Sequence, residues 1–187
     1  MSFFYRYSFL FGIISLSVCC NDIKMPKPKG YLSLDFSKPE YYKINEPCGY
    51  SFEMNKKALW ESQIKKCWNS IRYPDMKATL YISYVKVNNN IDSLLNDAYQ
   101  MPSKHINKAI EIPEKVFSNS NKKVFGTLFR VVGNAASQLQ FFLTDSTDNF
   151  LVGSLYFYSR PNYDSIMPAA RYIEEDVIRL IESFEWR

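Results

Sequence analysis

The chain has 187 residues, of which 47% are hydrophobic and 17% are aromatic, and its formal net charge is +4. This composition excludes an intrinsically disordered chain and indicates one packed globular domain with a sizeable core. A charge this small does not indicate a nucleic-acid partner, because such proteins present a clustered basic face.

The N-terminus holds a short apolar segment that ends at two adjacent cysteines. The segment runs from Tyr7 to Val18, behind Arg6. It is too short for a membrane-spanning helix, which needs roughly 20 apolar residues. Its proportions are those of a signal peptide, and an ordinary secretory signal has no use for a cysteine directly after the cut. We therefore predict a lipoprotein signal, whose final cysteine carries fatty acid such as palmitate.

Either cysteine can be the lipidated one. Cys20 follows a small residue, Cys19, but has Ser17 rather than Leu three positions upstream. Cys19 has Leu16 at that position, but the β-branched Val18 directly before it. We favour Cys20, with Cys19 as the alternative. A third interpretation treats both as ordinary thiols of the apolar segment.

With Cys20 as the lipid site, the chain divides into a signal peptide (1–19), a tether (20–29) and one globular domain (30–187). In the tether, Pro26 and Pro28 alternate with lysines, which favours an extended segment. The lysines are either attracted to anionic lipid headgroups or simply solvated.

Two further cysteines, Cys48 and Cys67, remain after the signal. In an oxidising compartment such a pair often forms a disulfide, but the sequence does not show that their Cβ atoms meet. The sequence is therefore compatible with a Cys48–Cys67 disulfide and with two free thiols. A metal site is not indicated, because the chain has one histidine and lacks a CxxC motif.

The first half of the domain has the patterns of strands. Period-2 alternation, or enrichment in aromatic and β-branched residues, predicts strands at 30–36, 49–54, 67–73 and 78–85. The polar residues 55–66 are predicted to be a connector. From Ile91 to Ala98, apolar residues at helical spacing predict a helix.

The second half returns to strands and ends in a helix. The stretch after Pro102, residues 103–117, is less regular, with short helices expected, and 118–121 form a turn. Three strands follow, at 123–132, 138–144 and 150–158, and residues 145–149 have a hairpin-loop composition. From Ser165 to Phe184 the apolar residues recur in steps of three and four, which predicts a long helix across one sheet face. The class is therefore α+β, an antiparallel sheet flanked by helices.

No motif assembles a catalytic, cofactor or metal site. Asp145 and Asp148 lack the Gly and Glu of an EF-hand loop and are predicted to bond backbone amides in a turn. His105 is predicted to be a surface or packing residue, since Lys104 beside it disfavours the protonated form. The chain has no Gly-x-Ser-x-Gly motif, and residues 133–137 lack the lysine of a phosphate loop. The acidic run Glu174, Glu175 and Asp176 is interpreted as a solvated helix face.

Aromatic residues are dense in two of the later strands. Phe141-Phe142 and the run 155–158 are apolar in consecutive positions. Sheet centres covered on both sides have this pattern, and so do docking surfaces. We favour burial and keep a partner surface as the alternative.

The chain resembles the GldD family of gliding-motility lipoproteins of Bacteroidota along nearly its whole mature length. The segments that carry this resemblance are PKPKGYLSLDF (26–36), CGYSFE (48–53), CWNSIRYP (67–74), ATLYISY (78–84), KVFG (123–126), GNAASQLQFFLTDSTDNFLVGSLYF (133–157), PNYDS (161–165) and IESFEW (181–186). The resemblance implies an envelope lipoprotein that is needed for gliding and linked to type IX secretion. It implies partners among the other lipoproteins of that machinery, and no enzymatic activity. The strand-rich body with a long final helix is also similar to PsbP-like domains, which are α/β/α sandwiches that usually act as assembly modules.

Three hypotheses about function follow. The first is a lipid-anchored, non-catalytic assembly or stabilising factor for partner proteins, facing the periplasm. The second is a small-ligand-binding or hydrolytic lipoprotein, which a deep apolar cavity with Arg130, Arg160 or His105 converging on it would favour. The third is a structural spacer that an unrelated lipidated domain could replace.

Overall fold

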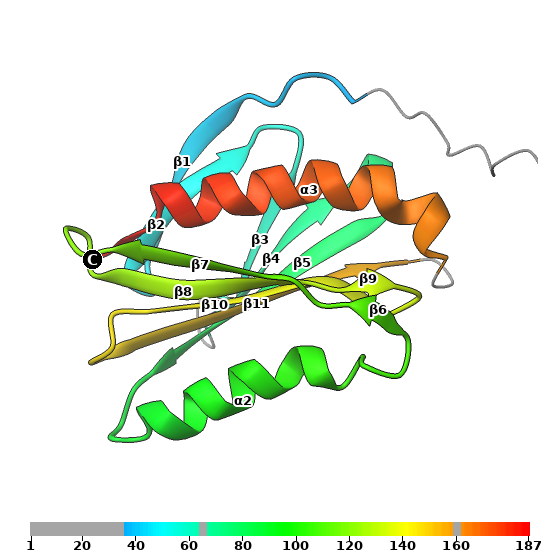
Figure 1. Ribbon diagram of the computed structural model, residues 1–187. Helices are drawn as coiled ribbons and strands as arrows, with labels where there is room; N and C mark the ends of the chain where they lie inside the picture. The colour runs from blue at the N-terminus through cyan, green and yellow to red at the C-terminus, as the bar shows by residue number, and fades with distance from the viewer. Residues whose placement is uncertain (1–35, 64–66, 159–161) are drawn as a thin grey trace, which may run out of the picture. The chain divides into compact units, whose positions relative to one another are not determined.

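A computed structural model describes residues 36–63, 67–158 and 162–187 of the chain (Figure 1). They form antiparallel sheets packed with two α-helices, α2 (Ile91–Ser103) and α3 (Tyr163–Ser183). The predicted α+β class, with a long helix close to the C-terminus, is confirmed. The predicted signal peptide, the tether and most of the predicted strand 30–36 lie outside the described residues.

The largest sheet has seven strands in the order β3-β4-β5-β11-β10-β8-β7. Every neighbouring pair in it is antiparallel. Its strands are β3 (Leu59–Gln63), β4 (Trp68–Tyr73), β5 (Ala78–Lys86), β7 (Glu114–Asn119), β8 (Val124–Arg130), β10 (Ser137–Thr144) and β11 (Asn149–Phe157). A short 3₁₀ helix, η3 (Pro74–Met76), joins β4 to β5.

One face of this sheet, the α3 face, packs against α3 and a small three-stranded sheet. The small sheet has the order β1-β2-β12, with β1 at Tyr41–Glu46, β2 at Tyr50–Asn55 and β12 at Glu185–Trp186. The helical periodicity of α3 turns Ile173, Val177 and Leu180 toward the sheet, where all three are buried. With side chains from β2, β4, β5, β10 and β11 they form the main core.

The opposite face, the α2 face, carries helix α2 (Figure 1). Phe129, Phe142 and Phe150 are buried in a second cluster together with Ala98 of α2. Successive residues of a strand point to opposite faces, so Phe141 enters the main core while Phe142 enters this second cluster. The predicted burial of Phe141 and Phe142 under cover on both sides is confirmed. A separate two-stranded sheet pairs β6 (Ala109–Glu111) with β9 (Val132–Gly133).

Several predictions about the elements are wrong. Residues 55–66 are more than a connector, since they contain β3, and β1 was not predicted. Residues 103–117 contain the last residue of α2, then β6 and part of β7, where short helices are expected from the sequence. β1, β3 and β7 lie at sheet edges, where one side of the strand meets solvent and the alternation of apolar residues is weak. Phe36, the described end of the predicted strand 30–36, lies outside any strand.

Candidate functional site

Helix α2 covers only part of the α2 face of the large sheet. The strand register shows which side chains lie on the part that the helix does not cover. Paired residues of an antiparallel ladder face the same side of the sheet. Phe150 of β11 belongs to the second cluster, on the α2 face. Because every second residue of a strand points to the same side, Tyr156 also lies on this face. Tyr156 pairs with Thr79 of β5, and two residues further along β5 Tyr81 also lies on this side.

The uncovered half carries several large aromatic side chains. Their exposed fractions are 52% for Trp68, 46% for Tyr81, 38% for Tyr156 and 61% for Tyr158. Arg72 of β4 pairs with Thr79 and adds a guanidinium to the same side. We call these five residues, Trp68, Arg72, Tyr81, Tyr156 and Tyr158, the open aromatic face.

The tyrosines of the open aromatic face are held in place by contacts with one another. The rings of Tyr81 and Tyr156 pack edge to face, with centroids 5.9 Å apart. The Tyr158 hydroxyl lies 3.0 Å from the Tyr81 hydroxyl and 3.0 Å from Thr79 Oγ1. The hydrogen bond with Tyr158, followed by burial, raises the pKa of Tyr81. Hydrogen bonds with Thr79 and Tyr81 lower the pKa of Tyr158.

The charges of the open aromatic face are balanced. Arg72 Nε forms a salt bridge of 2.9 Å with Glu61 Oε1 of β3, and both side chains are about half exposed. A shallow groove of about 280 Å³ lies beside this pair, lined by Glu61, Trp68, Ser70 and Tyr81 among others. The surface therefore offers aromatic rings, hydroxyls and one ion pair, without an excess of either charge.

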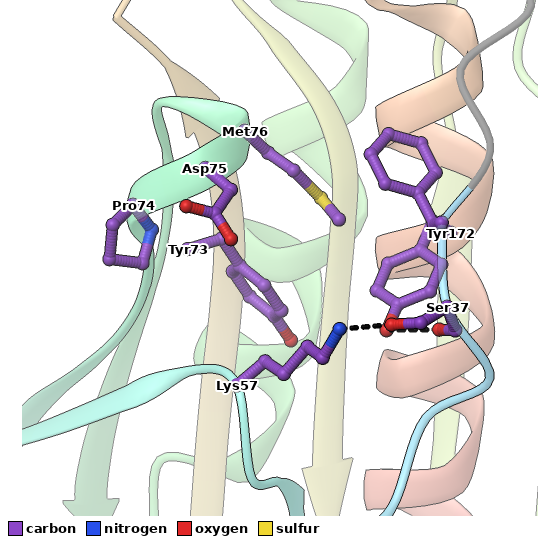
Figure 2. Close-up of a pocket in the computed structure, with 8 residues that line it drawn as sticks. Ser37, Lys57, Tyr73, Pro74, Asp75, Met76 and Tyr172 are labelled. Atoms are coloured by element: carbon purple, nitrogen blue, oxygen red, sulfur yellow. Dashed lines mark hydrogen bonds between the residues drawn. The ribbon is translucent and has the colours of Figure 1, made fainter.

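A separate cavity of about 260 Å³ lies where α3, η3 and the segment before β1 come together (Figure 2). Its lining residues are Phe36, Ser37, Lys57, Tyr73, Pro74, Asp75, Met76 and Tyr172. Neither Arg130 nor His105 lines it, so the arrangement that would favour the second hypothesis is not formed by these two residues. Arg160 lies outside the described residues.

Tyr73, which lines this cavity, is hydrogen-bonded to a buried carboxylate, that of Asp176, and this acid corrects a prediction. Asp176 is only 4% exposed, so it does not belong to a solvated helix face. Its carboxylate accepts hydrogen bonds from the Tyr41 hydroxyl at 2.7 Å, from Asn55 Nδ2 at 2.9 Å, and from the Tyr73 hydroxyl. Asp176 lies three residues after Ile173 and four before Leu180, so helical spacing could have placed it on the buried side.

Burial dominates the electrostatics of this acid. Loss of solvation raises the pKa of Asp176, and the hydrogen bonds from Asn55, Tyr41 and Tyr73 only partly offset it. Burial also raises the pKa of Tyr73 well above its usual value, with the neighbouring Asp176 as the next cause. Through these hydrogen bonds, Asp176 of α3 connects β1, β2 and β4 to the helix.

The other two acids of the run and Arg130 lie closer to solvent. Glu175 is exposed, and Glu174 is partly buried and pairs with Arg130 at 3.4 Å. This ion pair links α3 to β8 and leaves Arg130 in a structural contact.

The predicted roles of Asp145 and His105 agree with the structure. Asp145 Oδ1 accepts hydrogen bonds from the backbone amides of Thr147, Asp148 and Asn149. Burial alone would raise the pKa of Asp145, but these bonds and the Asn149 side chain outweigh it and lower the pKa to about 2. His105 is partly buried in the turn after α2, and burial followed by the Lys104 charge lowers its pKa.

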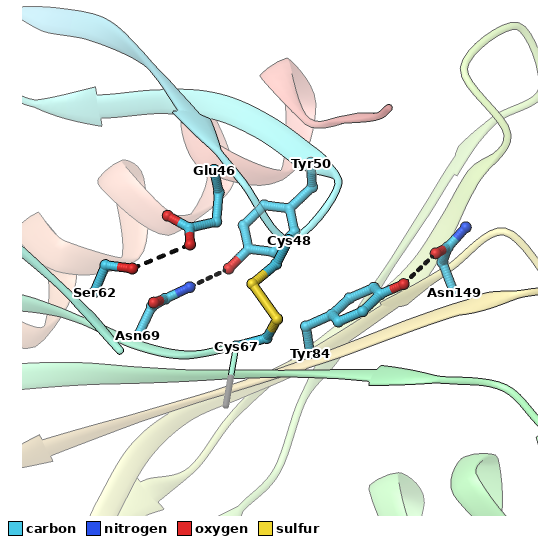
Figure 3. Close-up of a disulfide and its surroundings, with 8 residues drawn as sticks. All are labelled: Glu46, Cys48, Tyr50, Ser62, Cys67, Asn69, Tyr84 and Asn149. Atoms are coloured by element: carbon cyan, nitrogen blue, oxygen red, sulfur yellow. Dashed lines mark hydrogen bonds between the residues drawn. A yellow bond between two sulfur atoms is a disulfide. The ribbon is translucent and has the colours of Figure 1, made fainter. Parts of the chain in front are cut away.

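Cys48 and Cys67 form a disulfide, one of the two outcomes that the sequence left open (Figure 3). Cys48 lies in the turn between β1 and β2, and Cys67 directly precedes β4, so the bond ties the small sheet to the large one. Nearby, the Tyr50 hydroxyl accepts a hydrogen bond from Asn69 Nδ2 at 2.6 Å. The disulfide is thus part of the packing of the α3 face.

A family model described as gliding motility lipoprotein GldD matches residues 21–186. The chain belongs to this family. The resemblance identified from the sequence is confirmed, and it extends over the described domain. No curated protein matches the chain.

Membership of the GldD family makes this chain a membrane-anchored lipoprotein of the cell envelope that belongs to gliding motility. The predicted lipid sites, Cys20 and Cys19, lie outside the described residues. Within the described ranges, no helix is both long and apolar enough to cross a bilayer. The same part of the chain contains no group of three or more His, Cys, Asp or Glu residues placed to hold a metal ion.

The open aromatic face is the feature that sequence reasoning only partly anticipated. From the sequence, residues 155–158 could be either buried or part of a partner surface. In the structure, some of these residues are buried and others are exposed. Leu155 is fully buried, whereas Tyr156 and Tyr158 are exposed. The contribution of Trp68 and Tyr81 depends on the pairing of β4 with β5, which no local pattern gives.

Proposed function

We propose that this lipoprotein is a non-catalytic assembly and stabilising factor for other lipoproteins of the gliding machinery, with a link to type IX secretion. Lipid on Cys20, or on Cys19, holds the domain at the membrane, facing the periplasm. The domain binds its partner protein through the open aromatic face. The observation that carries this proposal is the uncovered half of the α2 face, with four aromatic side chains that are each at least 38% exposed.

The composition of the open aromatic face suits a protein partner. Tyr, Trp and Arg are the residues most enriched at the energetic centres of protein interfaces. A tyrosine or tryptophan gives a large contact area for few rotatable bonds. The Arg72–Glu61 pair leaves no excess of positive charge, so attraction to an anionic membrane surface is less favoured than a protein partner.

The described fold is compatible with this role. We propose that it is a PsbP-like α/β/α sandwich, a type of domain that usually acts as an assembly module. Fold alone does not determine function, so this likeness supports the proposal without carrying it.

Alanine substitution on the open aromatic face tests the proposal directly. The double variant Tyr81→Ala/Tyr156→Ala should abolish gliding and reduce the abundance of the partner lipoprotein, while the variant itself accumulates normally. Tyr42→Ala is a matched control, because Tyr42 has a similar exposed fraction of 40% but lies on β1. Normal gliding and export in the double variant would contradict the proposal.

Photocrosslinking identifies what occupies the surface. A photoreactive phenylalanine in place of Tyr156 should crosslink to another envelope lipoprotein of the motility machinery in intact cells, and one in place of Tyr42 should not. Crosslinks to lipid, or to a second copy of this chain, would replace the proposed protein partner by a membrane surface or a homodimer.

The lipid anchor has its own test. Cells grown with labelled palmitate should incorporate label into the wild-type chain. Cys20→Ala should remove the label, whereas Cys19→Ala should retain it. The reverse result would assign the lipid to Cys19, and an unlabelled wild-type chain would remove the anchor from the proposal.

A further inference from the structure

The cavity between α3, η3 and the segment before β1 is built from four segments that are far apart in the sequence. Ser37 precedes β1, Lys57 lies in the turn between β2 and β3, Asp75 and Met76 belong to η3, and Tyr172 belongs to α3. Its volume of about 260 Å³ is slightly below the range of drug-sized sites, about 300–1,000 Å³. The space therefore suits a compound of the size of an amino acid.

The cavity walls are apolar on one side and fixed by hydrogen bonds. The rings of Phe36 and Tyr172 lie 5.0 Å apart between centroids, and Figure 2 shows Met76 reaching toward Tyr172 from η3. The Tyr172 hydroxyl accepts a hydrogen bond from Asn55 Nδ2 at 2.9 Å and donates one to the Ser37 carbonyl at 3.3 Å. Walls held in this way need little ordering when a ligand enters, which favours binding.

The cavity also presents one cation and one anion that are not paired with each other. Lys57 Nζ donates a hydrogen bond to the neutral Ser37 Oγ (Figure 2). Lys57 and Asp75 are both exposed at the mouth of the cavity. Among the described residues, neither forms a salt bridge with a protein group, so each is free to pair with a ligand. By contrast, the neighbouring Lys56 is paired with Glu40 at 2.9 Å. A ligand with both charges can form an ion pair with each group, whereas a singly charged ligand can pair with only one and leaves the other to water.

We propose that this cavity binds a small zwitterion with an apolar side chain, the chemistry of a free apolar amino acid. Its carboxylate pairs with Lys57 and its ammonium with Asp75. Its side chain lies against Phe36, Met76 and Tyr172. This site is separate from the open aromatic face, and it does not depend on the proposed function.

The methyl group of Met76 provides a direct reporter. The full-length chain in detergent micelles is labelled with ¹³C at the methionine methyl groups, of which there are six, and the Met76 signal is assigned with Met76→Leu. L-Phenylalanine and the smaller L-leucine serve as probes. At least one of them should shift the Met76 signal in a saturable manner. Absence of a saturable shift with both would overturn the proposal.

Charge analogues test the recognition without altering the protein. 2-Phenylethylamine lacks the carboxylate, and 3-phenylpropionate lacks the ammonium group. Each should bind about two- to fivefold more weakly than phenylalanine, because it forms one exposed ion pair fewer. Equal affinity for all three compounds would show that Lys57 and Asp75 do not bind the charged groups of the ligand, and would also overturn the proposal.

Variants then assign each charge to its residue. Lys57→Met should weaken phenylalanine binding about two- to fivefold and remove the preference for phenylalanine over 2-phenylethylamine. Asp75→Asn should do the same for the preference over 3-phenylpropionate. Lys56→Met is the matched control, because Lys56 is the adjacent lysine but does not line the cavity, and it should bind like wild type. Unchanged charge preferences in both cavity variants would contradict the assignment.

Discussion

The two faces of the seven-stranded sheet use the same strands but end in different surroundings. On the α3 face, Leu80 of β5 and Leu155 of β11 are fully buried in the main core. On the α2 face, the same two strands present Tyr81 and Tyr156, which remain 46% and 38% exposed. Alternation along a strand therefore separates core from surface within one residue.

The α2 face itself contains a second contrast. Under helix α2, the sheet contributes three buried phenylalanines, Phe129, Phe142 and Phe150. The half-exposed Tyr99 of α2 packs edge to face on the first two of them. Beyond the helix the aromatic residues are tyrosines and a tryptophan, whose polar atoms can stay in contact with water. This difference indicates that the uncovered half is adapted to exposure, which is why we assign binding to it and stability to the α3 face.

Paired truncations on the two faces test this assignment, and they have the largest expected effect. Phe141→Ala should lower the free energy of unfolding by about 3–5 kcal/mol, because Phe141 is fully buried and its loss leaves a cavity. Tyr156→Ala should lower it by about 1 kcal/mol or less. Urea unfolding followed by circular dichroism measures both. Similar losses for the two variants would mean that the open aromatic face is part of the stabilising core.

Removing the Cys48–Cys67 disulfide tests how much this bond stabilises the packing of the small sheet on the α3 face. The two cysteines are 19 residues apart, and a closed loop of that length stabilises a fold by about 3 kcal/mol. Cys48→Ala/Cys67→Ala should lower the free energy of unfolding by that amount. A reducing agent should destabilise the wild type and leave the double variant unchanged. An effect of reduction on the double variant would show that the agent acts elsewhere.

Substitution of Asp176 tests how much its buried hydrogen bonds contribute to the stability of the α3 face. Asp176→Ala removes the acceptor of three donors, Tyr41, Asn55 and Tyr73. It should cost about 1–3 kcal/mol of unfolding free energy, because buried donors lose their partner. Glu175→Ala, an exposed position on the same helix, should change stability by about 0.5 kcal/mol or less. Equal effects would show that burial of the acid is irrelevant to stability.

The pH dependence of stability follows from the direction of the Asp176 shift. Its pKa is raised above the ordinary value of 3.8, mainly by burial, so the native state keeps this proton to a higher pH than the unfolded state. Stability from this group therefore falls as pH rises through 3.8 toward the raised pKa, and it is constant above that. Unfolding measured between about pH 3 and about pH 7 should show this decline in wild type relative to Asp176→Asn. An opposite slope would mean that the hydrogen bonds outweigh burial.

The sequence was most informative where the pattern is local. The alternation in residues 78–85 and the steps of α3 correspond closely to β5 and α3. The Asp145 turn follows from residues within four positions of one another. By contrast, β1 and β3 lie at sheet edges, where weak alternation hides the strand.

By itself, the sequence determined the α+β class, the main strands, the final helix and membership of the GldD family, because these depend on periodicity and on residue identity along the chain. The tertiary structure alone decided that Asp176 is buried, that Cys48 and Cys67 pair, and that the cavity at Lys57 and Asp75 exists. It also decided which half of the α2 face stays open. Each of these depends on which distant segments meet and on how far a helix extends over a sheet. Such long-range contacts leave no regular pattern in the chain.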